Sequence, residues 1–179
     1  ADLTLSYTKE EDKERLKKLQ KKIQKLHGEL YRRRIPVVLG FEGWDAGGKG
    51  GAIKRLTQKM DPRGYVVHPT ASPNDIERAH HYLWRFWTDM PTVGPVTIFV
   101  RTCYGRVLVE RIEGFCTSGE WQRAYTSLNV MDRALTDPGA LVRNFLLQTR
   151  KAEPARSSPD RAEIPPNAWS TTADTAANR

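Results

Sequence analysis

Apolar positions near the start of the chain repeat with a helical period. Between Thr8 and about Arg33, leucine or isoleucine recurs at alternating spacings of three and four residues, which predicts one amphipathic helix. Thr8 and Glu11 form a capping-box pattern, in which the hydroxyl and the carboxylate each satisfy a free backbone N–H at the first turn. The apolar stripe consists of Leu16, Leu19, Ile23, Leu26 and Leu30.

The other faces of this predicted helix are rich in lysine, namely Lys17, Lys18, Lys21, Lys22 and Lys25. A solvated helix face explains this run most simply. An arm that attracts phosphate and a subunit contact are the other two explanations, and the pattern does not choose among the three.

Four short apolar runs have the length and composition of buried parallel strands. They cover residues 35–41, 65–68, 96–100 and 141–147. Helices are predicted between them: one up to Met60, one from a Ser72 cap to just before Pro91, and one from a Thr117–Glu120 capping box to Leu135. Strands that alternate with helices predict an α/β domain of three layers around a parallel sheet.

The chain divides into three segments by composition. Residues 1–34 form the basic N-terminal helical extension, and residues 35–149 form the core of alternating strands and helices. Residues 150–179 contain several prolines and small polar residues with almost no apolar periodicity, so we expect an irregular lid or a disordered tail there.

Charge and cysteine content narrow the class of protein. The 29 Lys and Arg against 21 Asp and Glu give a net charge of +8, which suggests an acidic partner such as nucleic acid, nucleotide or inorganic phosphate chains. No run approaches the roughly 18 apolar residues of a membrane helix. Cys103 and Cys116 are expected to be reduced core thiols, and the charged N-terminus favours a cytoplasmic protein.

A glycine-rich motif carries the chemistry. Residues 43–49 fit the pattern G-x-x-x-x-G-K, directly after a predicted buried strand and before a predicted helix. Glycines in this context let backbone N–H groups surround phosphate oxygens, and the helix N-terminus adds positive charge. Lys49 would supply a point charge to the transferred phosphoryl group, unless the motif is only a turn with a solvated lysine. The predicted phosphate-binding residues are Gly43, Gly47, Gly48, Lys49, Gly50 and Gly51.

Two residues of the motif bear on metal binding. Gly50 stands where such loops usually carry the Ser or Thr that holds magnesium. Asp45, inside the loop, would repel phosphates unless a cation lay between them, so we expect it to bind Mg²⁺. The alternative is a carboxylate that caps amides of its own loop.

Arginines follow the third predicted strand. Arg101 should point toward the phosphates, because ligands bind at the carboxyl ends of parallel strands. Arg106 and Arg111 would either bind further phosphates or pair with the neighbouring Glu110 and Glu113. Nucleic acid is a weaker expectation, because no base-stacking motif or DNA-binding module is present.

Several segments resemble the polyphosphate kinase 2 family, and together they cover about residues 5–147. They are Phe41–Leu56, Asp61–Tyr65, His80–Trp87 and Tyr104–Phe115. The amino-acid sequence around residues 68–73 and 113–116 is most similar to the polyphosphate:AMP phosphotransferase branch of this family.

The resemblance implies a thymidylate-kinase-like P-loop fold and Mg²⁺-dependent phosphoryl transfer between inorganic polyphosphate and AMP or ADP, with ATP as a possible product. Carried over by position, Asp45 is a metal-binding and catalytic carboxylate, Lys49 is the catalytic loop lysine, and Lys54, Arg101 and Arg106 contact phosphates. We group Arg101 with the catalytic residues, as a stabiliser of the transition state. A homo-oligomer is also implied.

Two departures from the family put catalysis in question. The family has Asp-Arg-Ser/Thr-Trp-Tyr after the third strand, whereas this chain has Val100-Arg101-Thr102-Cys103-Tyr104. Loss of the second magnesium-binding carboxylate predicts a drop in activity of several orders of magnitude, since each 1.4 kcal/mol is about tenfold in rate. The tail from residue 167 has also lost the basic helical character of the family's lid. The alternative is therefore a catalytically impaired subunit, or a fragment, that binds phosphate or nucleotide.

Overall fold

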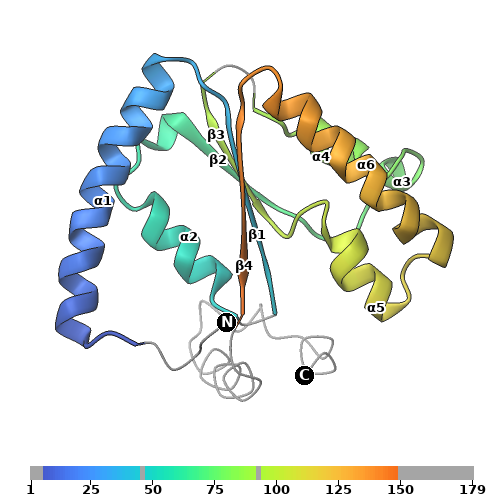
Figure 1. Ribbon diagram of the computed structural model, residues 1–179, viewed down its shortest axis with the longest axis horizontal. Coiled ribbons are helices and arrows are strands. Elements are labelled where there is room, and N and C mark those ends of the chain that lie inside the picture. The colour runs from blue at the N-terminus through green and yellow to red at the C-terminus, as the bar shows by residue number, and fades with distance from the viewer. Residues whose placement is uncertain (1–5, 45–46, 92–93, 149–179) are drawn as a thin grey trace.

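The fold is built around one parallel sheet. The structure is a computed structural model that describes residues 6–44, 47–91 and 94–148. Four strands, β1 (Val37–Gly43), β2 (Tyr65–Pro69), β3 (Val96–Val100) and β4 (Leu141–Leu147), lie in the order β2-β3-β1-β4. All three pairings are parallel, and the predicted α/β class is confirmed (Figure 1).

The strand register brings the carboxyl ends of the strands to one edge of the sheet. Val37 of β1 pairs with Val96 of β3 on one side and with Leu141 of β4 on the other. Phe41 likewise lies between Val100 and Phe145. The segments that follow β1 and β3, which begin at Trp44 and Arg101, therefore leave the sheet side by side at this edge.

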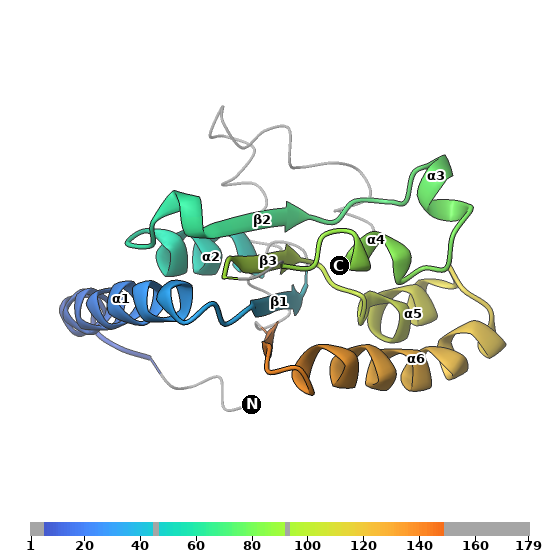
Figure 2. The same ribbon diagram turned by 90° about the horizontal axis from the view of Figure 1, so that it is seen from above.

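Helices cover both faces of the sheet, which gives the three predicted layers (Figures 1 and 2). On one face lie α1 (Lys9–Arg32) and α2 (Lys49–Thr57), followed by the 3₁₀ turn η1 (Pro62–Gly64). The helices on the opposite side are α3 (Asp75–Arg78), α4 (Trp84–Trp87), the π-helical turn η2 (Arg106–Glu110), α5 (Arg111–Glu113) and α6 (Ser118–Thr136).

The side chains of β1 divide between two apolar cores because successive residues of a strand point to opposite faces. Val37 and Phe41 pack with Ile53 of α2 in one core. Val38 packs with Leu128 of α6 in the other, together with Leu83, Phe86, Phe99, Cys103 and Met131. Both cysteines are free thiols, but only Cys103 lies in a core as expected, whereas Cys116 is half-buried. Burial raises the pKa of the Cys103 thiol to about 12.

Helix α1 begins as predicted, although its apolar stripe is only partly buried. The Thr8 hydroxyl accepts from the Glu11 N–H at 3.3 Å, and the Thr8 N–H donates to the Glu11 carboxylate at 3.0 Å. Leu19 and Leu26 are 56% and 54% exposed, so the five residues of the apolar stripe are not all buried. Gln20 and His27 are buried in their place.

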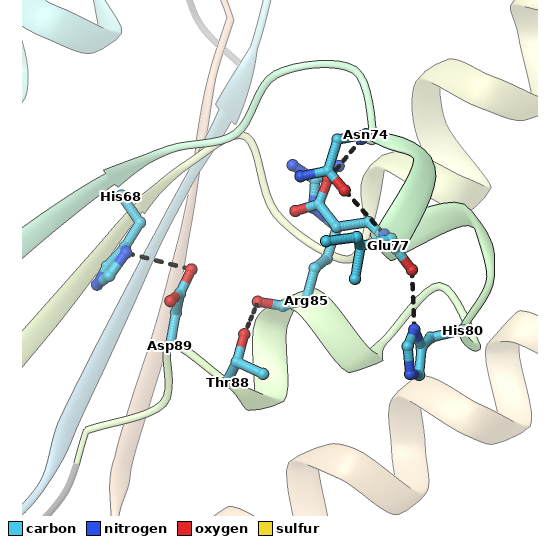
Figure 3. Close-up of polar contacts among 8 residues, drawn as sticks. His68, Asn74, Glu77, His80, Arg85, Thr88 and Asp89 are labelled. Carbon is cyan, nitrogen blue, oxygen red and sulfur yellow. Dashed lines mark hydrogen bonds and ion pairs between the residues drawn. The ribbon is translucent and has the colours of Figure 1, made fainter.

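The predicted helix from Ser72 to Pro91 is instead two short helices. Asn74, not Ser72, is the cap of α3, and its side chain accepts from the Glu77 N–H at 2.9 Å. Helix α3 ends at Arg78, and beyond it His80 Nδ1 lies 2.8 Å from the Ile76 carbonyl oxygen (Figure 3). The chain turns before α4, so this prediction was wrong in its start and its continuity.

Three other differences concern helices and strand ends. β1 covers Val37–Gly43 and not residues 35–41, because Glu42 and Gly43 continue the pairing with β4. α2 ends at Thr57, and Met60 lies beyond it. The helical stretch formed by η2 and α5 was not predicted.

The division at residues 34 and 149 stays a prediction, and the predicted tail lies outside the described residues. Among the described residues, no helix is both long enough and apolar enough to cross a bilayer.

Candidate phosphate-binding site

Two glycines give the loop between β1 and α2 its shape. Gly43 has a φ of 136°, and a Cβ at this position would lie 2.1 Å from the Leu147 carbonyl oxygen of β4. Gly48 has a φ of 85° and forms the N-cap of α2. L-amino acids with side chains rarely adopt these backbone angles, so both positions favour glycine. The strand-loop-helix arrangement expected from the sequence is present.

Lys49 is held inside its own loop. Its ammonium donates to the carbonyl oxygens of Gly43 and Trp44 at 2.7 and 2.8 Å, and the residue is only 8% exposed. It is therefore not a merely solvated lysine. The Gly47 N–H donates to the same Trp44 carbonyl at 2.9 Å, so this oxygen accepts both from the lysine ammonium and from the backbone next to α2.

The remaining predicted loop residues lie at the start of α2. Gly50 and Gly51 are in its first turn, and neither has an atom close to where a Cβ would stand. Lys54 follows one turn later and is exposed. Asp45, the predicted metal ligand, lies outside the described residues. In the described ranges, no group of three or more His, Cys, Asp or Glu side chains is arranged to hold a metal ion.

Val100 ends β3 next to the loop, and its surroundings are apolar. It pairs with Phe41 of β1 and Pro69 of β2. It also packs against the core that contains Ile53 of α2. A side chain at this position therefore points to the face of the sheet that carries the helix of the loop lysine, and the valine fills that space with hydrocarbon.

Arg101 begins the turn after β3. Its φ of 64° lies in the left-handed region, which is uncommon for a residue other than glycine. Its N–H donates to the Phe41 carbonyl at 3.0 Å, and its side chain is exposed. The structure thus brings Arg101 to the same edge of the sheet as Gly43 and Lys49.

Glu42 is a residue of this region that the sequence analysis did not identify. It is 6% exposed, and its Oε1 accepts from the Thr102 N–H at 2.5 Å and from the Thr102 hydroxyl at 2.8 Å. A single acidic residue at the end of an apolar strand was the available signal. Phe41 and Val100 point to one face of the sheet, so Glu42 points to the other. It does not take the place of a carboxylate at position 100.

Arg106 and Arg111 are engaged by nearby side chains. Arg106 Nε lies 3.1 Å from Glu110 Oε2, an ion pair without the alignment of a hydrogen bond, and its guanidinium lies 4.5 Å from the centre of the Tyr82 ring. Arg111 lies 4.0 Å above the Trp121 ring. For Arg106 the structure favours the pairing with a neighbouring glutamate, whereas Arg111 stacks on an aromatic side chain.

An open cleft of about 230 Å³ lies beside the loop, between η2 and the end of β4. Tyr104 forms part of its wall, and its hydroxyl donates to Asp132 at 2.7 Å while Asn144 donates to the hydroxyl at 3.1 Å. Burial, and then the Asp132 carboxylate, raise the pKa of Tyr104 well above its usual value of 10. The other wall residues are Glu42, Val107, Leu108, Asn144, Phe145 and Leu146.

Polar contacts hold together the segment after β2 (Figure 3). His68 Nδ1 lies 3.2 Å from Asp89 Oδ2, and Arg85 Nε of α4 lies 3.3 Å from Glu77 Oε1 of α3. The Arg85–Glu77 pair is largely buried, so it links the two short helices. The ring of His80 stacks on that of Trp84, with centroids 4.3 Å apart.

Comparison with known proteins identifies relatives of this chain. Residues 6–179 match the family model described as polyphosphate kinase 2. The chain is 42% identical over 181 aligned residues to a polyphosphate:AMP phosphotransferase of Pseudomonas syringae pv. tomato. This alignment covers 99% of the chain and 36% of that protein. It is 46% identical over 143 residues to a protein of the same name from Acinetobacter johnsonii, covering 80% of this chain and 30% of that protein.

A solved structure from Pseudomonas aeruginosa PA01, described as a polyphosphate kinase 2, superposes with a TM-score of 0.92 at 39% identity. The match covers 99% of this chain and 39% of that one. The chain therefore spans about a third of the length of the curated relatives it matches.

Proposed function

The chain belongs to the polyphosphate kinase 2 family, and we propose that it transfers a phosphoryl group between inorganic polyphosphate and a nucleoside mono- or diphosphate. The observation that carries the proposal is the buried Lys49 ammonium, held 2.7–2.8 Å from two carbonyls inside a glycine loop that joins β1 to α2. A phosphate that enters this loop meets backbone N–H groups, the helix N-terminus and a positive charge that needs no large movement.

The chain's own residues would act mainly by position and charge. Lys49 would stabilise the negative charge that develops on the transferred phosphoryl group, and Arg101 would approach it from the neighbouring strand end. Gly43, Gly47, Gly48, Gly50 and Gly51 would surround the phosphate oxygens, and Lys54 would contact a further phosphate. Arg106 and Arg111 would take part only after exchanging Glu110 and Trp121 for phosphate.

Magnesium is part of the proposal and rests on the sequence. Mg²⁺ usually keeps several waters and binds through one or two carboxylates plus substrate phosphates, so a cluster of protein ligands is not required. Asp45 would be the carboxylate of this chain that binds Mg²⁺. Among the described residues, no second carboxylate is available on the α2 face of the sheet at the strand ends, because position 100 is a valine and Glu42 points to the other face. Bound Mg²⁺ would neutralise charge on the phosphates during transfer.

The apolar surroundings of Val100 favour a second function. If transfer needs a carboxylate at position 100, the chain binds polyphosphate or nucleotide at the loop with little turnover. It would then act as a catalytically impaired binding unit, and this possibility matters because the chain spans only part of its relatives.

We also propose that the chain acts as a homo-oligomer in the cytoplasm. Ile112 and Phe115, near the end of the η2–α5 stretch, are 78% and 74% exposed, and exposed apolar side chains of this size are typical of contact surfaces. Sedimentation of the purified chain tests the oligomer, and fractionation of cells that express it tests the location.

The function is tested by incubating the purified chain with Mg²⁺ and polyphosphate and measuring ADP or ATP formed from AMP, ADP or GDP. We expect product with AMP or ADP, and a loss of roughly 10²–10³ in kcat for Lys49→Met. Lys13→Met, an exposed lysine of α1, serves as the control and keeps full activity. Polyphosphate binding without product from any acceptor would favour the impaired binding unit.

A further inference from the structure

The lysine-rich side of α1 is exposed and mostly without acidic partners. Between Glu14 and Glu29 the helix carries six cations and no acidic residue, and all six are exposed. Lys18 pairs with Glu14 at 2.6 Å, and Arg15 lies 4.4 Å above the Tyr7 ring. Within the described ranges the other four cations, Lys17, Lys21, Lys22 and Lys25, form no ion pair.

The lysines occupy one side of the helix because the opposite side is anchored. Gln20 donates to the Arg55 carbonyl at 2.9 Å and to Gln58 Oε1 at 2.8 Å, and His27 Nε2 lies 3.0 Å from the Gly64 carbonyl. At 3.6 residues per turn, the five lysines fall within one arc of about 140° that avoids both anchors. The cations therefore form a rigid, outward-facing array rather than a flexible arm.

Helix α2 extends this charged surface toward the phosphate loop. Figures 1 and 2 show α1 and α2 side by side on the same face of the sheet. Arg55, whose carbonyl receives Gln20, has an exposed side chain, as do Lys54 and Lys59. Since α2 begins at Lys49, exposed cations continue from the loop along α2 and across to α1. We call this surface the α1–α2 basic face.

We propose that the α1–α2 basic face binds the body of a long inorganic polyphosphate chain whose terminal phosphates occupy the loop. The choice of polyanion rests on the proposed function. Lysines three and four positions apart on α1 repel one another, and a string of phosphates along them relieves this repulsion and releases bound counterions. Nucleic acid fits less well, because the arc of α1 that carries the five lysines holds no aromatic side chain for base stacking.

The test compares two variants of the full 179-residue chain with equal charge change. In the first, Lys17, Lys21, Lys22 and Lys25 become Gln, which leaves the Lys18–Glu14 pair intact. In the control, four exposed arginines outside the α1–α2 basic face become Gln, namely Arg78 of α3, Arg123 and Arg133 of α6, and Arg143 of the edge strand β4. Binding of long-chain polyphosphate and of tripolyphosphate is measured directly at several salt concentrations, with circular dichroism to check folding.

We expect the lysine variant to bind long-chain polyphosphate at least tenfold more weakly, with tripolyphosphate affinity changed less than twofold. The slope of the logarithm of its binding constant against the logarithm of salt concentration should be shallower by roughly two to three, because each of the four lost phosphate contacts contributes about 0.7. The control should match the unmodified chain. Equal long-chain affinity in the two variants overturns the inference, as does full displacement of polyphosphate by single-stranded RNA of equal charge.

Failure of the proposed function is visible separately. If no nucleotide is phosphorylated while the lysine variant alone loses long-chain binding, the basic face stands as a polyphosphate site and the catalytic proposal falls. If transfer occurs and both variants bind long chains equally, the proposed function stands and the polyphosphate site on the basic face falls.

Discussion

Glu42 accepts two hydrogen bonds from Thr102, one from its N–H and one from its hydroxyl, across the ends of β1 and β3. Both residues are buried. Glu42 directly precedes the first loop glycine, and Thr102 directly follows Arg101. This contact therefore ties the strand that enters the phosphate loop to the turn that presents the nearby arginine.

Thr102→Val should lower the free energy of unfolding by about 1–3 kcal/mol, because the buried Glu42 carboxylate loses one of its two donors from Thr102. Thr102→Ser keeps the hydroxyl and should cost less, which makes it the matched control. Urea unfolding of both variants measures the difference. No loss for Val, or a larger loss for Ser than for Val, would mean that the methyl group of Thr102 contributes more than its hydroxyl.

Gly43→Ala should destabilise the fold more than Gly48→Ala. Both have a positive φ, but an added Cβ at Gly43 meets the Leu147 carbonyl at 2.1 Å whereas the space at Gly48 is open. We expect about 1–3 kcal/mol for Gly48→Ala from backbone strain alone and more for Gly43→Ala. Thermal unfolding checks this order, with Gly28→Ala in α1 as a control that should be neutral or stabilising. The opposite order would show that the approach of β4 to the loop is not tight.

Stability should decline at alkaline pH partly through Tyr104. Its pKa is raised in the folded state by burial and by Asp132, so the folded chain holds this proton more tightly than the unfolded chain. The contribution is complete below about pH 10, the unfolded value, and is lost as the pH rises above it toward the folded value.

Tyr104→Phe should therefore make the loss of unfolding free energy between pH 9 and 11 less steep. It should also cost about 1 kcal/mol at pH 7 through the lost hydrogen bond. Urea unfolding across this range is the measurement, and Tyr125→Phe on α6 is the control. An unchanged slope would leave the alkaline decline to Tyr82 and Cys103, whose pKa values are each raised to about 12 by burial.

Val100→Asp should increase phosphoryl transfer at least tenfold if the rest of the site is intact, because it restores a carboxylate at the strand end. It should also destabilise the chain by about 1–3 kcal/mol, since the position packs against an apolar core. Val100→Asn is the control, because asparagine matches aspartate in shape and polarity but carries no charge. Coupled assays measure phosphoryl transfer, and unfolding measurements give the change in stability. If Asp and Asn behave alike in the assay, the residue at position 100 is not what limits turnover.

Much of the fold could be predicted from the sequence because the relevant signals are local. The Thr8 and Thr117 capping boxes, the strand at Val96–Val100 and the loop between β1 and α2 each depend on residues close together in the chain. The motif at Gly43–Lys49 was found for the same reason, as glycine and lysine spacing reports a backbone shape directly. The family resemblance rests on such segments.

Only the tertiary structure decided which side chains meet across distant segments. No local pattern shows that Glu42 bonds to Thr102 60 positions away, that Val100 faces the α2 side of the sheet, or that the Arg106 guanidinium lies over the Tyr82 ring. The leucine spacing of α1 was consistent with burial of Leu19, but packing against α2 turned Gln20 inward, because its amide finds partners there. The sequence determined the glycine-lysine loop and the family of the chain, whereas strand register and helix packing determined which groups surround that loop.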